Sequence, residues 1–180
     1  MAGRLVPEKG YNFMISAMSL LISRGLKVKL DIYGEGPLLD KINQDIQSHN
    51  LSSAITINES VDHTVLFNKI LLSDLLVLSS ISEGLPMSAA EAMVIGTPIV
   101  ATKVGGLPEM IEDQVSGVLI DSRDPNSLAN AIEQVLINRD LQRKLSDGGV
   151  RRIQEKYSSD KVCINLINYF EEVHKNRGMN

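Results

Sequence analysis

The stretch LLVLSSISEGLPMSAAEAMVIGTPIVA, residues 75–101, decides the fold of this chain. It begins with a short apolar run at 75–78, passes through a loop of serine, glutamate and glycine, and continues into a helical pattern at 88–95. A second apolar run follows at 99–101. Short continuous apolar runs on either side of a helix are typical of parallel strands that are buried on both faces. The stretch therefore predicts a β-α-β unit within a parallel sheet.

The same alternation of strand and helix extends outward in both directions. Further strands are expected at 28–32, 54–57 and 118–120, and further helices at 13–21, 37–50, 65–72 and 107–112. After residue 121 the strand-like runs stop, and helical patterns follow at 126–136, 138–156 and 159–176. This order predicts an α/β fold with a doubly wound, mainly parallel, Rossmann-like sheet and a helical C-terminal tail.

Length and composition indicate one folded domain covering residues 1–180. Hydrophobic residues make up 43% and charged residues 22% of the sequence, values near those of soluble globular domains. The net charge of -4 and the absence of a long basic tract argue against a nucleic-acid partner. The lone Cys163 excludes an internal disulfide framework, and no apolar run is long enough to span a membrane. A cytoplasmic location is expected, because the first residues contain no apolar signal core.

The loop after the strand at 75–78 contains the first candidate site residues. Ligands of open α/β sheets bind beyond the carboxyl ends of the strands. Here Glu83 and Gly84 precede a helix that contains Glu91. The start of that helix suits a phosphate, and a carboxylate beside it suits sugar or ribose hydroxyls, which together suggest a nucleotide sugar. From spacing alone, an ordinary acid at a helix start and a solvated Glu91 explain the pattern equally well.

Three other features contribute weaker signals. The adjacent Gly105 and Gly106 follow a strand and open a helix, which modestly favours close approach of a ligand. The loop at 34–37 lacks the third glycine of a dinucleotide fingerprint, so dehydrogenase chemistry is disfavoured. Arg4 and Lys9 could neutralise a diphosphate, or be plain surface charges.

Metal and nucleophile chemistry finds no support in the sequence. His49, His63 and His174 are scattered without metal spacing or a Ser-His-Asp arrangement, and none is assigned a role. No two aspartates are two positions apart, so a D-x-D clamp for a diphosphate is missing. Charge on a bound diphosphate must then be neutralised by the protein itself.

Five motifs, in this order and at these intervals, resemble the family 4, or group 1, glycosyltransferases. The motifs are GRLVPEKG at 3–10, YGEGP at 33–37, SEGLP running to EAM at 82–93, GTPIVA at 96–101 and GGLPE at 105–109. Each motif alone is a weak signal, but the five in sequence are highly specific, and they include two glutamates separated by seven residues, Glu83 and Glu91. The resemblance covers nearly the whole chain.

The resemblance implies a GT-B architecture, in which two Rossmann-like domains face each other across a cleft. This chain is similar to the C-terminal, donor-binding half, and the N-terminal acceptor-binding domain is absent from it. The family has an apolar strand before the Gly-Arg-Leu motif, where only Met1 and Ala2 stand here. We therefore expect the sheet to lack or shorten one central strand. The last helix of the family crosses onto the other domain, which would explain the wide apolar arc around Tyr169 and Phe170.

The resemblance also assigns roles to individual residues. Arg4 and Lys9 match the pair that grips the donor diphosphate, Glu83 matches the contact to the donor sugar, and Glu91 matches the acid that holds the ribose hydroxyls. It thereby implies that Arg4, Lys9 and Glu83 are catalytic. The remaining donor-binding positions are backbone positions: Gly84, Leu85 and Pro86 at the sugar and phosphate, and Gly34 and Gly36 near the nucleoside.

The implied activity is a sugar transfer with retention of configuration, without a metal or another cofactor. The donor would be a nucleotide-diphosphate sugar, with UDP favoured and GDP and ADP open. The acceptor would be a saccharide or a lipid-linked sugar in cell-surface polysaccharide or glycolipid synthesis. The isolated fragment is expected to be inactive without its N-terminal domain, and the full-length protein could contact a membrane peripherally. The loop Asn58-Glu59-Ser60 departs from the glycine that the family often has there.

Two other functions remain to be separated from this one. A catalytically inert sugar-nucleotide-binding module of the same fold is disfavoured, because Arg4, Lys9, Glu83 and Glu91 are all present. A sugar-nucleotide epimerase of GT-B shape is disfavoured by the spacing of the two glutamates.

Overall fold

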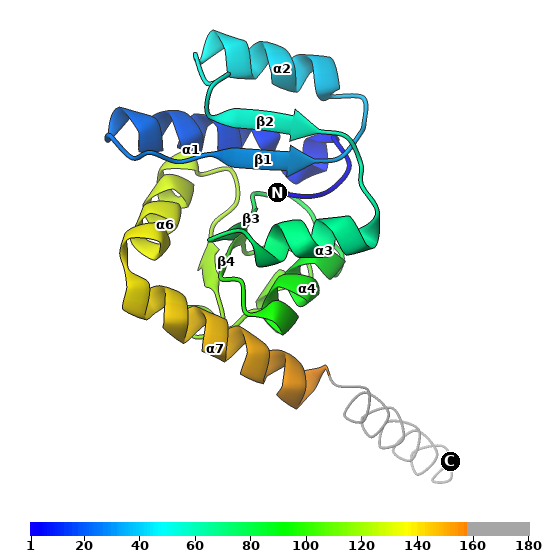
Figure 1. The fold of residues 1–180 in the computed structure, drawn as a ribbon, viewed down its shortest axis with the longest axis vertical. Helices are drawn as coiled ribbons and strands as arrows, with labels where there is room; N and C mark the ends of the chain where they lie inside the picture. Colours follow the sequence, from blue (N-terminus) through cyan, green and yellow to red (C-terminus); the bar gives the residue numbers. More distant parts are fainter. Residues whose placement is uncertain (158–180) are drawn as a thin grey trace, which may run out of the picture.

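The computed structural model of the chain describes residues 1–157, and within this range strands and helices alternate as the sequence predicts (Figure 1). The strands are β1 (Leu30–Tyr33), β2 (Ile55–Asn58), β3 (Leu76–Leu78), β4 (Ile99–Thr102) and β5 (Val118–Ile120). The helices are α1 (Tyr11–Ser23), α2 (Leu39–Ser48), α3 (His63–Leu71), α4 (Met87–Ile95), α5 (Leu107–Met110), α6 (Pro125–Ile137) and α7 (Arg139–Lys156), with a 3₁₀ turn η1 (Pro7–Lys9) before α1. The helix expected at 159–176, with its apolar arc, lies outside the described residues.

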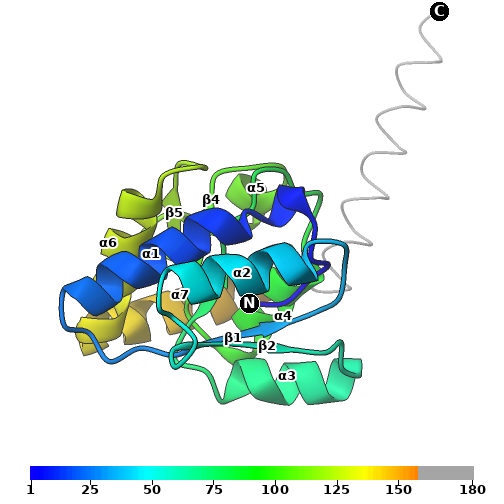
Figure 2. The ribbon, with the colours of Figure 1, turned by 90° about the horizontal axis from the view of Figure 1, so that it is seen from above.

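All strand pairs are parallel. The residues of β3, β4 and β5 are buried on both faces, whereas Asp31 of β1 and Thr56 of β2 are exposed. Val77, Val100 and Val118 belong to one hydrophobic cluster, which includes residues of α1, α2 and α6. Leu76, Ile99 and other alternate residues of β3 and β4 belong to a second cluster, with residues of α3 and α4. Figure 2 shows α1 and α2 on one side of β1 and β2 and α3 on the other. The prediction of a doubly wound parallel α/β fold is therefore confirmed.

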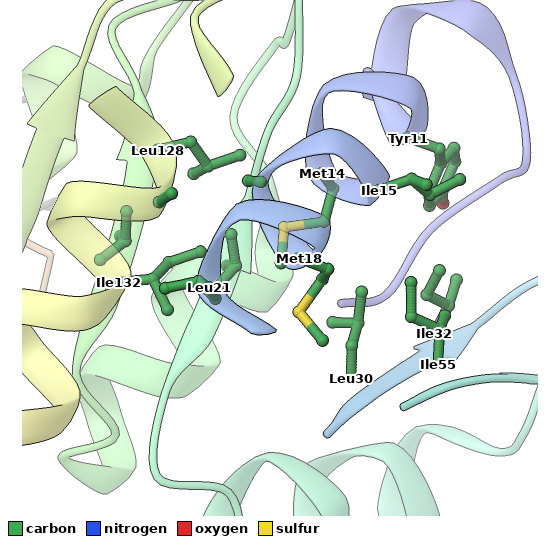
Figure 3. Packing of buried hydrophobic residues seen from close by; sticks show 14 of the residues in the cluster. Tyr11, Met14, Ile15, Met18, Leu21, Leu30, Ile32, Ile55, Leu128 and Ile132 are labelled. Carbon is green, nitrogen blue, oxygen red and sulfur yellow. The ribbon is translucent and has the colours of Figure 1, made fainter. Parts of the chain in front are cut away.

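The first cluster connects the two ends of the domain. Met14, Met18 and Leu21 of α1 lie between the strand residues Leu30, Ile32 and Ile55 and the α6 residues Leu128 and Ile132 (Figure 3). Burial of one aliphatic side chain of this size stabilises a fold by roughly 1.5–3 kcal/mol. Helix α1 is thus fixed against both sheets, which also fixes the loop that precedes it.

The sheet is divided between β1 and β3. One sheet has the order β1-β2 and the other β3-β4-β5. At the carboxyl end of β1, the N–H of Gly3 donates to the carbonyl of Tyr33 at 3.0 Å, and Ala2 forms a parallel bridge with Tyr33. A groove of about 700 Å³, lined by residues of β1, β3, α1 and α6, occupies the rest of the gap. The strands of residues 1–157 thus form two separate sheets, as expected if one central strand is missing or shortened.

Most helix boundaries differ from the sequence-based expectation by one or two residues. The helix expected at 107–112 ends at Met110, because Ile111 adopts an extended conformation and is buried in the second cluster. The helix expected to start at Pro37 starts at Leu39, after a turn. None of the helices within residues 1–157 has the length and apolar character required to cross a membrane.

Candidate functional site

The candidate site lies at the carboxyl edge of the strands, where the loop before α1 meets the loop after β3. The N–H of Ile81 donates to the carbonyl of Glu8 at 2.7 Å. The hydroxyl of Ser79 donates to the carbonyl of Lys9 at 3.0 Å. These bonds join segments about 70 residues apart in sequence. They fix the backbone of Lys9 beside the loop that carries Glu83.

Lys9 and Glu83 form an ion pair within this contact. The Nζ atom of Lys9 lies 2.6 Å from Oε1 of Glu83, and the hydroxyl of Ser80 donates to the same oxygen at 2.6 Å. The side chain of Glu83 is only 8% exposed, so its charge requires these donors. No hydrogen bond to Oε2 of Glu83 occurs within residues 1–157, so this oxygen can accept one from a ligand.

Tyr11 fixes the loop that carries Arg4. Its hydroxyl lies 3.1 Å from the carbonyl oxygen of Gly3 and 3.2 Å from that of Arg4, and its single proton is shared between these two acceptors. Burial raises the pKa of Tyr11 to about 12, and the nearby charge of Glu83 contributes to the rise. The side chain of Arg4 is exposed and has no ion pair among the described residues. Its guanidinium is therefore free to bind an anion.

Glu91, on α4, has one oxygen without a partner. The Nε2 atom of His63 lies 2.8 Å from Oε1 of Glu91, and the side chain of Glu91 is 11% exposed. Oε2 is buried and accepts no hydrogen bond within the described part of the chain. A buried acceptor without a donor costs roughly 1–3 kcal/mol, so such an atom is expected where a ligand supplies the donor.

Helix α4 connects the two glutamates. Glu83 precedes the helix, Pro86 is its N-cap residue, and no side chain caps its first turn. The first N–H groups of a helix have no partner within the helix, and with the helix dipole they attract anions. An uncapped start between two carboxylates suits a ligand that carries both phosphate and hydroxyl groups.

The glycines of the site differ in whether packing within the chain requires a residue without a Cβ atom. A Cβ atom on Gly34 would collide with the carbonyl of Gly3, and one on Gly36 would come within 2.6 Å of the carbonyl of Leu5. One on Gly105 would collide with the carbonyl of Glu83. These three glycines are explained by packing of one loop on another. A Cβ on Gly84 would meet nothing within 4 Å, so contacts within the described chain do not require this glycine.

The sequence predicted part of this arrangement. Lys9 and Glu83 are brought together, and Glu91 lies on the helix that follows Glu83. Leu85 is half exposed, and Pro86 ends the loop. Tyr11, Ser80 and His63 were missed as partners of the site. For His63, the available signal was its position after a strand, at the edge of the sheet where the other candidates lie.

No group of three or more histidine, cysteine, aspartate or glutamate residues within residues 1–157 is arranged to hold a metal ion. The family profile described as "Glycosyl transferases group 1" matches residues 1–152. The chain belongs to the group 1 glycosyl transferases.

Two known proteins resemble the chain, one in sequence and one in both sequence and fold. An uncharacterized glycosyltransferase of Methanocaldococcus jannaschii is 30% identical over 172 residues, which is 95% of this chain and 47% of that protein. The crystal structure of a mutant of Staphylococcus aureus TarM, in complex with fondaparinux, alpha-GlcNAc-glycerol and UDP, has a TM-score of 0.85 at 30% identity. The match covers 94% of this chain and 34% of that one. The chain thus spans half or less of these two relatives.

A C-terminal domain of known structure has the same fold as this chain. The C-terminal domain of LpcC, a group 1 family protein of Francisella tularensis, has a TM-score of 0.79 at 23% identity. The match covers 88% of this chain and 84% of that domain, a likeness of fold. The fold is that of the C-terminal domain of a GT-B glycosyltransferase.

Proposed function

We propose that this chain is the donor-binding domain of a retaining, metal-independent glycosyltransferase. The enzyme would move a sugar from a nucleotide-diphosphate sugar to a saccharide or lipid-linked acceptor in cell-surface polysaccharide or glycolipid synthesis. The observation that carries the proposal is Oε2 of Glu91, a buried acceptor without a donor on the helix that follows the Lys9–Glu83 pair. A ribose hydroxyl would supply the missing donor.

The diphosphate of the donor would bind where positive charge and free N–H groups are available. Lys9 has three N–H donors and uses one on Glu83, so it can also bind a phosphate oxygen. Arg4 and the uncapped start of α4 add to the positive potential. These groups would bind most strongly to the charge that develops on the departing diphosphate, which makes them catalytic as well as binding residues.

Glu83 would bind the donor sugar. The sugar and the diphosphate share one oxygen atom, so the residues that bind them must lie next to each other, as Lys9 and Glu83 do. The open space at Gly84 would let the backbone approach the sugar or the phosphate closely.

The acceptor would bind to an N-terminal domain that is not part of this chain. Support comes from the relatives, of which the chain spans 47% and 34%. We expect no transfer by the 180-residue chain alone. We expect transfer by the full-length protein to persist in EDTA, and loss of activity in EDTA would contradict the metal-independent part of the proposal.

UDP is the favoured nucleotide, because the TarM structure contains UDP at 30% identity to this chain. Ligand-observed NMR of the chain with millimolar UDP, GDP, ADP and their sugars would identify the base. Glu91→Ala should raise the Kd of the bound nucleotide roughly 10- to 150-fold, which corresponds to a lost hydrogen bond to a charged group of about 1.5–3 kcal/mol.

Glu155→Ala is the matched control, because Glu155 is exposed on α7 and has no ion pair in the described residues. Its Kd should equal that of the unmodified chain. Binding of none of the three nucleotides would reject the proposed function. An unchanged Kd in Glu91→Ala would reject the ribose assignment.

A further inference from the structure

His63 contacts Glu91 from a different helix. It is the first residue of α3, which begins after the loop that follows β2, and its side chain is 72% exposed. Its Nε2 atom lies 2.8 Å from Oε1 of Glu91 on α4, and α3 packs against α4. A side chain this exposed contributes little burial, so burial in the core does not explain its orientation.

The contact divides the two oxygens of Glu91 between different partners. A carboxylate can only accept hydrogen bonds, so the Nε2 atom of His63 must be the donor to Oε1. Oε2 is then the oxygen left buried and without a donor. With Oε1 held, rotation of the carboxylate about its last torsion would break this hydrogen bond. The direction of Oε2 is therefore set in part by His63.

The ring of His63 is itself restrained. The ring of Phe67, four residues further along α3, lies with its centroid 6.4 Å from that of His63 at an interplanar angle of 32°. Residues four apart on a helix share one face, so this contact limits the positions that the imidazole can take. The restraint passes from Phe67 through His63 to the carboxylate of Glu91.

We propose that His63 is a positioning residue that sets the selectivity of this chain for ribose over deoxyribose nucleotides. The Nε2–H of His63 donates to Oε1 of Glu91. This hydrogen bond keeps Oε2 directed at the ribose hydroxyl, from which Oε2 accepts a hydrogen bond. The inference rests on the proposed binding of ribose by Glu91. His63 touches the carboxylate and acts on the nucleotide through it.

The test compares UDP with 2′-deoxy-UDP and 3′-deoxy-UDP on the 180-residue chain. The unmodified chain should bind UDP at least roughly tenfold more tightly than one of the deoxy analogues, the size expected of a hydrogen bond to a charged group. His63→Ala should reduce this ratio to about threefold or less, while the Kd of that analogue changes less than about twofold. If His63 had only a structural role, His63→Ala would weaken the binding of all three nucleotides by the same factor.

His63→Gln and His49→Ala are the controls. The side-chain amide of glutamine can donate to Oε1, so His63→Gln should restore most of the selectivity. His49 lies at the end of α2, where its Nδ1 contacts the carbonyl of Asp45 at 2.8 Å, and His49→Ala should leave the ratio unchanged. Thermal unfolding of each variant shows whether it is folded, and His63→Gln keeps the test valid should His63→Ala unfold.

The outcomes separate this inference from the proposed function. Loss of selectivity in Glu91→Ala but full selectivity in His63→Ala would overturn the role of His63 and leave the ribose assignment standing. An equal loss of affinity for all three nucleotides in His63→Ala would also overturn it. If the unmodified chain bound no nucleotide, or showed no preference for UDP over the deoxy analogues, the ribose assignment and this inference would both fail.

Discussion

Gly84 and Gly105 lie in loops that contact each other, yet contacts within the described chain require only one of them to be glycine. Gly105 has a φ of +55°, in the left-handed region, and a Cβ there would collide with the carbonyl of Glu83. Gly84 has no positive φ, and the position that its Cβ would occupy is open. The difference separates a glycine required for folding from one that is available for a ligand.

We therefore expect Gly105→Ala to affect mainly stability and Gly84→Ala to affect mainly nucleotide binding. Gly105→Ala should lower the free energy of unfolding by more than about 2 kcal/mol, since left-handed strain of roughly 1–2 kcal/mol adds to the collision. Gly84→Ala should leave stability within about 0.5 kcal/mol and weaken nucleotide binding by about 1–3 kcal/mol. Urea unfolding and NMR titration measure the two quantities. Equal stability of the two variants would contradict the structural distinction.

Tyr11 makes the stability of the chain sensitive to alkaline pH. Its pKa is raised to about 12 in the folded chain, against about 10 in the unfolded one. The folded state therefore favours the neutral phenol, and the resulting stability is complete below pH 10 and is lost as the pH rises toward 12. Tyr11→Phe should therefore remove the part of the stability loss at alkaline pH that comes from ionisation of Tyr11.

At pH 7 the same substitution should cost about 1 kcal/mol, because the hydroxyl no longer bonds the carbonyls of Gly3 and Arg4. Urea unfolding at pH 7 and pH 11 tests both statements. Tyr33→Phe is the control, since the hydroxyl of Tyr33 has no hydrogen bond within residues 1–157. A fall in stability from pH 7 to pH 11 as steep in Tyr11→Phe as in the unmodified chain would contradict the assignment.

At the scale of the element, α7 contains two adjacent glycines with different surroundings. A Cβ on Gly148 would collide with the carbonyl of Val115, whereas one on Gly149 would meet its neighbours at an ordinary distance of 3.6 Å. Gly148 therefore lets α7 approach the loop before β5 closely.

Helix propensity alone would predict that alanine stabilises α7 at both positions, by up to about 1 kcal/mol. We expect this gain only for Gly149→Ala. Gly148→Ala should lower the free energy of unfolding by about 1–3 kcal/mol, because α7 must move away from the Val115 carbonyl. Urea unfolding of the two variants forms a matched pair, and a gain in both would show that the packing of α7 is looser than the structure indicates.

The start of α6 depends on an ionised aspartate. Oδ2 of Asp124 accepts from the hydroxyl of Ser127 at 2.6 Å, and Oδ1 accepts from the N–H groups of Ser127 and Asn126. The side-chain hydrogen bond of Ser127 and then its backbone N–H lower the pKa of Asp124. A depressed carboxyl pKa stabilises the fold above the unfolded pKa of about 4, and this stability is lost as the pH falls through the folded pKa.

Asp124→Ala should therefore lower the Tm at pH 7, and the difference from the unmodified chain should shrink below pH 4. Thermal unfolding followed by circular dichroism at both pH values measures this. Asp121→Ala, which removes an exposed carboxylate three residues earlier, should change the Tm little at either pH. A Tm difference for Asp124→Ala that stays constant with pH would argue against an ionised cap.

At the scale of the whole molecule, the division between the two sheets leaves a groove lined by both apolar and polar residues. Leu30 and Ile70, Leu76 and Val77 are among its buried lining residues, and the edges of β1 and β3 on either side of it do not pair with each other. Unpaired strand edges accept another strand readily. Ala2 already pairs in parallel with Tyr33 at one end.

Extension of the chain before Met1 by five valine and isoleucine residues should place a strand in this groove. Each buried side chain contributes roughly 1.5–3 kcal/mol, against roughly 1–2 kcal/mol for ordering its backbone. We expect a net gain in the free energy of unfolding of at least about 1 kcal/mol, measured with urea on monomeric protein. An extension of equal length in glycine and serine is the control, and equal stability of the two chains would contradict the expectation.

The sequence by itself determined the alternation of strands and helices and the positions of Lys9, Glu83 and Glu91. These features are local, because burial on two faces imposes short apolar runs on strands and the site motifs follow the strands directly. Through the resemblance to the glycosyltransferase family, it also predicted a missing or shortened central strand, which agrees with the two separate sheets.

The tertiary structure alone decided which side chains meet. His63 and Glu91 are 28 residues apart and on different helices, and Lys9 and Glu83 are 74 residues apart. The end of α5 at Met110 and the closeness of Gly105 to Glu83 likewise depend on what packs nearby. A periodic pattern specifies which face of a helix or strand is buried. It does not specify which other element packs on that face, because the choice depends on how the packed layers fit together.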